Sequence, residues 1–223
     1  MVRSLAIRSL VVAFAFGSTS SIVSAQLTPY SGFDASANAP GVNSIAARNA
    51  FIAATGGSVG LNFEGATPAG VTFTGGILRT GGTVRGGPCS LFGCNTTPGG
   101  NSFLDLNEFG ATRFDFASPI SFFGGFVGGQ QLTGSSLRVF LSGGPQDIPI
   151  TFSSTGGWGF YGFSSTETVS RVDVFIASDY VGIDDVIYPR GGISAVPEPS
   201  TYALMAVGLA ALGIGARRRR TRA

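Results

Sequence analysis

Short apolar runs, separated by clusters rich in glycine, serine, asparagine and proline, make up most of this 223-residue chain. Several runs alternate, as where Phe114 and Phe116 share one face of an extended segment while Arg113 and Asp115 share the other. Many short strands with turn residues between them predict an all-β sandwich or barrel. The expected strands are 58–63, 71–73, 77–84, 103–106, 112–116, 120–127, 137–141, 148–152, 158–163, 169–176 and 181–188.

One short N-terminal helix is expected at 40–55. Asn43 or Ser44 is the expected N-cap residue, and Gly56 ends the helix, because glycine readily adopts the left-handed conformation of a helix C-terminus. Phe51 lies on an apolar stripe that can pack against the sandwich. We therefore divide the body into an N-terminal extension with a helix, 26–57, and a β-sandwich domain, 58–190.

The N-terminus has the three parts of a secretory signal peptide. Arg3 and Arg8 supply the positive charge, an apolar run follows at 10–16, and small residues at 23–25 form a cleavage site. The apolar run is too short to span a bilayer. We predict a signal helix within 1–25 that is removed from the mature protein.

The C-terminus contains a second targeting signal. Pro197-Glu198-Pro199 lies in a linker, 191–200, that the prolines hold extended. An apolar segment at 201–216 predicts a single transmembrane helix near the lower length limit, and the basic tail 217–223 follows it. By the positive-inside rule this tail stays cytoplasmic, so the body lies outside the cytoplasm. The residues predicted to stop the membrane segment are Arg217, Arg218, Arg219 and Arg220.

Motif, apolar helix and basic stop, in this order, resemble the PEP-CTERM sorting signal of exported bacterial proteins. The resemblance implies recognition of Pro197, Glu198 and Pro199 by a membrane-embedded exosortase. It also implies that the protein is anchored in the cytoplasmic membrane before processing, then passed to the cell surface or released. An ordinary C-terminal anchor after a proline-rich linker is the alternative.

The charge of the exported body restricts its function. Residues 26–196 carry seven arginines and eleven acidic residues, a net charge of −4, and the whole chain lacks lysine and histidine. Such a body is poorly suited to binding nucleic acid. Without histidine, neither a histidine-dependent nucleophile nor a histidine-ligated zinc site can form. We therefore expect that the protein is not an enzyme. The alternative is a carboxylate-dependent carbohydrate-active enzyme, either a glycoside hydrolase or a lyase.

Three acidic residues form a candidate metal site. Glu64 follows an early strand, and Asp184 and Asp185 lie in the last one. This pair of strand motifs resembles the jelly-roll sandwiches of MAM-like, laminin-G-like and carbohydrate-binding domains, in which first and last strands can be neighbours. Carboxylates brought together in this way suit Ca²⁺, the candidate cofactor. The alternative is that the aspartates accept hydrogen bonds from loop backbone and anchor the final strand.

Two further pairs complete the candidate residues. Cys89 and Cys94 are close in a glycine-rich loop, and in an oxidising exported setting we expect a disulfide. The alternative is a redox pair or a metal site. Trp158 and Tyr161 belong to an aromatic strand that either stacks against sugars or lies in the core. The predicted function is that of a non-catalytic surface or extracellular-matrix protein that binds exopolysaccharide.

Overall fold

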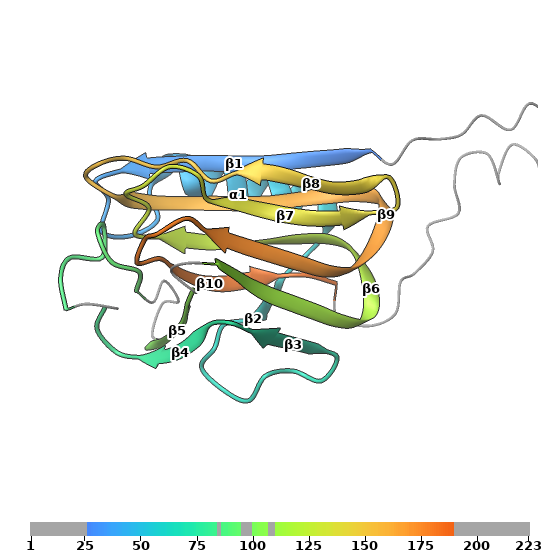
Figure 1. Cartoon of the computed structure of the whole chain (residues 1–223), viewed down its shortest axis with the longest axis horizontal. Helices are drawn as coiled ribbons and strands as arrows, with labels where there is room; N and C mark the ends of the chain where they lie inside the picture. Colours follow the sequence, from blue (N-terminus) through green and yellow to red (C-terminus); the bar gives the residue numbers. More distant parts are fainter. Residues whose placement is uncertain (1–25, 84–85, 95–99, 107–109, 190–223) are drawn as a thin grey trace, which may run out of the picture.

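The computed structural model describes residues 26–83, 86–94, 100–106 and 110–189. These residues form a β-rich domain with one helix, as the sequence predicts (Figure 1). The elements are β1 (Leu27–Ala35), α1 (Val42–Thr55), β2 (Val59–Leu61), β3 (Val71–Thr74), β4 (Ile77–Thr80), β5 (Ser102–Asp105), β6 (Gly110–Gly128), β7 (Ser136–Leu141), β8 (Gly144–Pro149), β9 (Gly157–Ile176) and β10 (Gly182–Ile187).

Two long strands organise the sheet. β6 has 19 residues and β9 has 20, and they pair antiparallel along most of their length. Their register shifts between Asp115 and Ile120, and again between Ile120 and Phe122. At this irregular segment both strands turn back on themselves, which we call the bend (Figure 1). Strands that pass from one layer to the other through such irregularities form the corners of folded sheets.

The bend folds one ten-stranded antiparallel sheet into a two-layered, sandwich-like arrangement. One layer contains the second half of β6 and the first half of β9, joined by β1, β10, β2, β5 and β4. The other contains the remaining halves of β6 and β9, joined by β3, β7 and β8. Apolar side chains from both layers, including the fully buried Phe114, Phe123 and Phe163, form the main core.

Helix α1 covers the outer face of the first layer (Figure 1). Phe51 of the helix is fully buried against Phe160 and Phe122, with ring centroids 5.3 and 5.9 Å apart. Trp158 and Phe126 belong to the same cluster. This layer is therefore buried on both faces, which explains why 157–163 contains aromatic residues and glycines without the alternating polar residues of a half-exposed strand.

The N-cap of the helix lies two or three residues before the expected one. Gly41 is the N-cap residue, so the prediction of Asn43 or Ser44 is wrong, while Gly56 ends the helix in the left-handed conformation as predicted. Glycine has no side chain with which to cap a helix, and the carboxylate of Asp34 in β1 takes this role. It accepts hydrogen bonds from the backbone N–H groups of Gly41, Asn43 and Ser44 at 2.9–3.1 Å.

Several strand assignments differ from the sequence prediction. The strand expected at 148–152 is Gly144–Pro149 in the structure, so it overlaps the prediction by two residues only. β1, which pairs with β9 from Leu27 to Ala35, was not predicted, although it belongs to the same sheet as the sandwich. The segments 112–116 and 120–127 are halves of one strand, as are 158–163 and 169–176. The expected pairing of an early strand with the last one is confirmed, because Leu61 of β2 lies opposite Val186 of β10.

The membrane segment predicted at 201–216 and the signal peptide at 1–25 lie outside the described residues. Within the described part of the chain, no helix has the length and apolar character needed to cross a bilayer.

Candidate functional site

The two ends of the described domain lie at the bend. At one end, the backbone N–H of Gln26 donates to the hydroxyl oxygen of Thr166 in β9 at 3.1 Å. At the other, Pro189 lines a pocket with Phe116 and Ser118 of β6. The chain therefore continues toward Pro197, Glu198 and Pro199, and then toward Arg217–Arg220, from the bend end of the molecule. These residues lie outside the described part.

The disulfide predicted between Cys89 and Cys94 is present, with the Cα atoms 5.6 Å apart. Its loop packs against the strand ends opposite the bend, since the backbone N–H of Gly157, at the start of β9, donates to the carbonyl oxygen of Ser90 at 2.7 Å. A Cβ atom on Gly156, which has φ +67°, would overlap the same carbonyl. The disulfide thus holds a closely packed loop at the end remote from the termini.

Glu64, one of the predicted metal ligands, contacts backbone N–H groups through its carboxylate. Its Oε1 atom accepts hydrogen bonds from the backbone N–H groups of Asn101 and Ser102, each at 2.6 Å. It therefore fastens the loop that follows β2 to the start of β5. Among the residues that the structure describes, no group of three or more cysteine, aspartate and glutamate side chains lies close enough together to hold a metal ion.

Asp184 and Asp185 are both buried in β10. Asp185 has φ +50°, which is uncommon for a residue other than glycine, and the pairing of β10 with β6 shifts register just after Asp184. The backbone N–H of Asp185 donates to Oδ1 of Asp184 at 2.8 Å. A hydrogen bond between a carboxylate and local backbone is the arrangement that the alternative to a calcium site predicts.

The prediction that Trp158 and Tyr161 stack against a ligand is corrected by their burial. Trp158 is 0% exposed and Tyr161 is 2% exposed, so neither presents a ring face to solvent. Trp158 faces α1, whereas Tyr161 belongs to the core between the two layers. Burial raises the pKa of Tyr161 to about 12, although its hydroxyl is hydrogen-bonded to the backbone N–H and carbonyl of Thr151.

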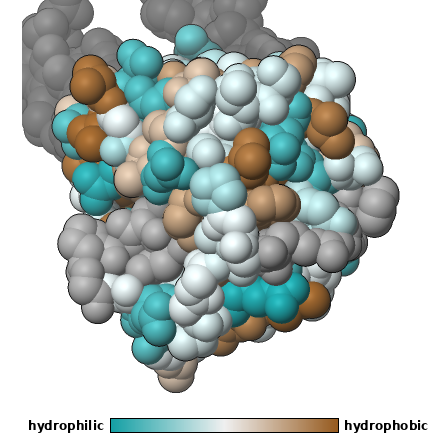
Figure 2. Space-filling model, turned by 90° about the vertical axis from the view of Figure 1, so that its left-hand side faces the viewer, coloured by the Kyte–Doolittle hydropathy of each residue, from teal (hydrophilic) through white to brown (hydrophobic). Residues whose placement is uncertain are grey.

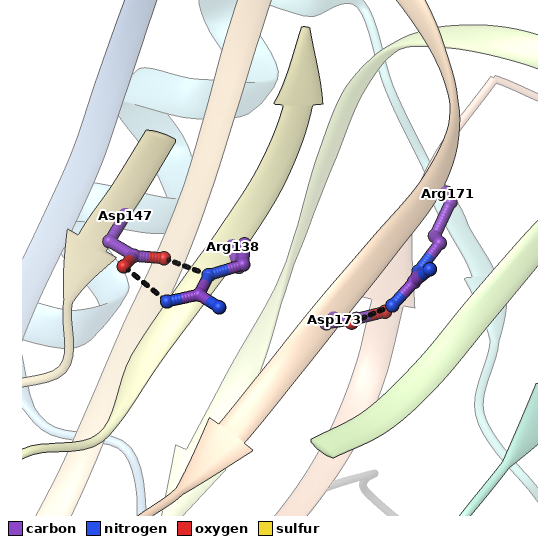
Figure 3. A network of polar contacts seen from close by, with 4 residues as sticks. All are labelled: Arg138, Asp147, Arg171 and Asp173. Atoms are coloured by element: carbon purple, nitrogen blue, oxygen red, sulfur yellow. Dashed lines mark hydrogen bonds and ion pairs between the residues drawn. The ribbon is translucent and has the colours of Figure 1, made fainter. Parts of the chain in front are cut away.

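A row of alternating charges crosses the outer face of the second layer. Arg113 of β6, Asp173 of β9, Arg138 of β7 and Asp147 of β8 are successive cross-strand partners. Figure 3 shows Arg138 forming two hydrogen bonds to Asp147, at 2.7 and 2.8 Å, and Arg171 paired with Asp173. Opposite charges placed directly across neighbouring strands stabilise a sheet.

These pairs also alter the ionisation of their members. Hydrogen bonds from Arg138 lower the pKa of Asp147, and the same bonds raise the pKa of Arg138. The hydrogen bonds to Asp173 raise the pKa of Arg171. Arg138, Asp147 and Arg171 therefore remain charged at neutral pH. Their fixed, planar hydrogen-bonding groups are therefore suited to binding a polar ligand and not to transferring protons.

An open groove of about 530 Å³ lies beside this row, between the start of β7 and the end of β8. Asp147 forms one wall, and the floor includes Ile150, which is 4% exposed. Phe152, at the rim, is 46% exposed. The other lining residues are mostly hydroxyl-bearing or small: Thr133, Gly134, Ser135, Ser136, Pro149 and Thr151.

The sequence pattern gives no indication of this groove. Arg138 and Asp147 alternate with apolar residues, which places them on the outer face of their strands. Nothing in their sequence spacing indicated that the loops before β7 and after β8 would meet beside them. Figure 2 shows the face opposite the bend, where hydrophobic side chains are scattered among polar ones.

Comparison with known families supports the assignment made from the C-terminal residues. Residues 195–220 match the model of the PEP-CTERM protein-sorting motif. No curated protein and no solved structure matches the chain. The match is confined to the tail, and it supports the prediction of an exported protein that is sorted by an exosortase. The chain is therefore identified as a protein that carries the PEP-CTERM sorting motif, joined to a β-rich body.

Proposed function

We propose that the protein is a non-catalytic component of the cell surface or extracellular matrix, displayed after an exosortase processes its tail. The match of residues 195–220 to the PEP-CTERM protein-sorting motif carries this proposal. In it, the segment 201–216 anchors the chain in the cytoplasmic membrane until it is cut near Pro197, Glu198 and Pro199. The body is a jelly-roll-like sandwich in this proposal, which the pairing of β2 with β10 supports.

The arrangement of the domain is consistent with display. Gln26 and Pro189 both lie at the bend, so the chain enters and leaves the domain on one side. The disulfide loop and the groove beside Asp147 lie away from the point at which the chain continues to the sorting motif. A domain attached in this way presents its remote end to the surroundings of the cell.

A non-catalytic role is supported by the contacts of the carboxylates. Asp34 caps α1, Glu64 fastens the start of β5, and Glu167 accepts hydrogen bonds from the backbone and hydroxyl of Ser142. Asp105 is paired with Arg79 at 2.8 Å. These contacts give each of these four carboxylates a structural task. Extracellular polysaccharide is the partner that we propose for the displayed domain. Binding of calcium by Glu64, Asp184 and Asp185 stays a prediction.

Replacement of Glu198 by alanine tests the sorting step. Glu198 is the only charged residue of Pro197-Glu198-Pro199. Glu198→Ala should therefore leave uncleaved protein in the cytoplasmic membrane of a strain that has the sorting enzyme. Western blots of membrane and surface fractions measure this. The melting temperature of the body should equal that of the wild type.

Ser194→Ala, just before the matched residues, is the control and should be processed normally. Processing of Glu198→Ala at the wild-type rate would show that the tail is a plain anchor. That result would overturn the proposed function.

A further inference from the structure

The groove beside Asp147 combines three features that suit one kind of ligand. Phe152 offers an exposed ring at the rim, and Phe175, 37% exposed, lies opposite Ser136 in the neighbouring strand. The hydroxyl-bearing residues Ser136 and Thr151 line the groove together with Phe152. The paired Arg138 and Asp147 add fixed donors and acceptors at the wall. Apolar ring faces next to convergent polar groups are the usual composition of a small-ligand site.

The charges around the groove are balanced. The outer face of this layer carries the arginines Arg113, Arg138 and Arg171, and the aspartates Asp115, Asp147 and Asp173, which lie opposite one another across the strands. Asp147 is the one charged residue among the described residues that line the groove, and Arg138 pairs with it through two hydrogen bonds. The groove therefore has no net charge with which to attract a phosphate polymer or a cation. Binding of a neutral ligand does not require such a net charge.

An extended peptide is also disfavoured. β8 is the last strand in the sheet order, so its outer edge is the one that a peptide strand would join. Pro145 and Pro149 lie in this strand and lack the N–H groups that strand addition requires. A ligand recognised by side chains and ring faces, and not by backbone pairing, fits the edge better.

From these contacts we propose that the groove beside Asp147 binds a neutral, hydroxyl-rich glycan chain. The sugar C–H faces lie on the ring of Phe152, and the sugar hydroxyls exchange hydrogen bonds with Asp147, Arg138 and the groove hydroxyls. The open ends of the groove leave room for a chain to continue past the site. The inference rests on the proposed function, because it assigns a ligand-binding site to the displayed domain.

The test uses the exported protein on an array of neutral and acidic oligosaccharides, with dextran affinity electrophoresis as a second measurement. Wild-type protein should bind neutral glycans in preference to acidic ones. Phe152→Ala should weaken binding about tenfold or more, the loss expected when an aromatic anchor is truncated. Phe152→Trp should retain binding. Val42→Ala is the matched control, since Val42 is an exposed apolar residue of α1, remote from the groove.

A second variant guards against a folding defect in Phe152→Ala. Thr133 is exposed at the groove, and Thr133→Trp should abolish binding by filling it. Undiminished binding by Phe152→Ala or Thr133→Trp, a preference for acidic glycans, or no glycan binding by wild type would overturn the inference. Each variant should be sorted and processed normally. A failure of glycan binding with normal processing therefore overturns the inference alone, whereas normal processing of Glu198→Ala overturns the proposed function.

Discussion

The carboxylate of Asp34 connects β1 to the start of α1, and its replacement should destabilise the domain. Both its oxygen atoms are used: Oδ1 accepts from the backbone N–H of Asn43, and Oδ2 accepts from those of Gly41 and Ser44. The cap residue is glycine, so no side chain at position 41 can replace these bonds. Asp34→Ala therefore leaves helix N–H groups without their acceptor.

Loss of a capping side chain costs about 1 kcal/mol in the free energy of unfolding, within a range of roughly 0.5–2 kcal/mol. Removal of a negative charge from a helix N-terminus adds about 0.3–1 kcal/mol. We therefore expect Asp34→Ala to lower the free energy of unfolding by about 2 kcal/mol, taking both contributions together. For a domain of this size this corresponds to a decrease of roughly 4–8 °C in the melting temperature. Asp34→Asn, which keeps one acceptor oxygen, should cost about half as much.

The pH dependence separates this explanation from a general packing defect. Burial alone would raise the pKa of Asp34, but hydrogen bonds from Ser44, Asn43 and Gly41 outweigh it and lower the pKa below its ordinary value of 3.8. A group whose folded-state pKa is lowered stabilises the fold above its unfolded pKa, and this contribution is lost as pH falls through the folded pKa. The difference between wild type and Asp34→Asn should therefore be full at pH 7 and shrink below about pH 4.

Thermal and urea denaturation, followed by circular dichroism at pH 7 and pH 3, measure both quantities. Ser31→Ala, an exposed position in the same strand, is the matched control and should change stability little. A difference between wild type and Asp34→Asn that is equal at both pH values, or an Asp34→Ala protein as stable as wild type, would refute the capping explanation.

Two further predictions concern buried and covalent contacts. Tyr161→Phe removes the hydroxyl that is bonded to Thr151, and should lower the free energy of unfolding by about 1–3 kcal/mol in urea titrations at pH 7. Because the pKa of Tyr161 is raised to about 12, wild-type stability should also fall between about pH 10 and 12, and less so in Tyr161→Phe; an equal fall in both proteins would contradict this. Exchange of Cys89 and Cys94 for serine should cost about 2 kcal/mol, since the closed loop is short. Mass spectrometry of unreduced wild-type protein should find two hydrogens fewer in this segment, and freely alkylatable thiols would contradict the disulfide.

Local sequence patterns predicted the parts of this protein that depend on neighbouring residues alone. The alternation around Phe114 and Phe116 assigned their faces in the strand, Gly56 ended the helix, and the proximity of Cys89 and Cys94 indicated their disulfide. The sorting motif was equally readable, because it is a linear pattern within residues 195–220. Each of these features involves residues within a few positions of one another.

Tertiary structure decided what each face of a strand meets. From sequence alone, the aromatic residues at 158–163 indicate either an exposed platform or a core. In the structure α1 covers one face of this strand and the second layer covers the other. The expected strands are interrupted before Ile120 and before Val169. In the structure a continuous strand bends at each of these places, because β6 and β9 pair with each other on both sides of the bend. Asp34 and the groove beside Asp147 depend on such distant contacts as well. Periodicity determines which side chains share a face, but only the packing of remote segments determines whether that face is buried, capped or open to a ligand.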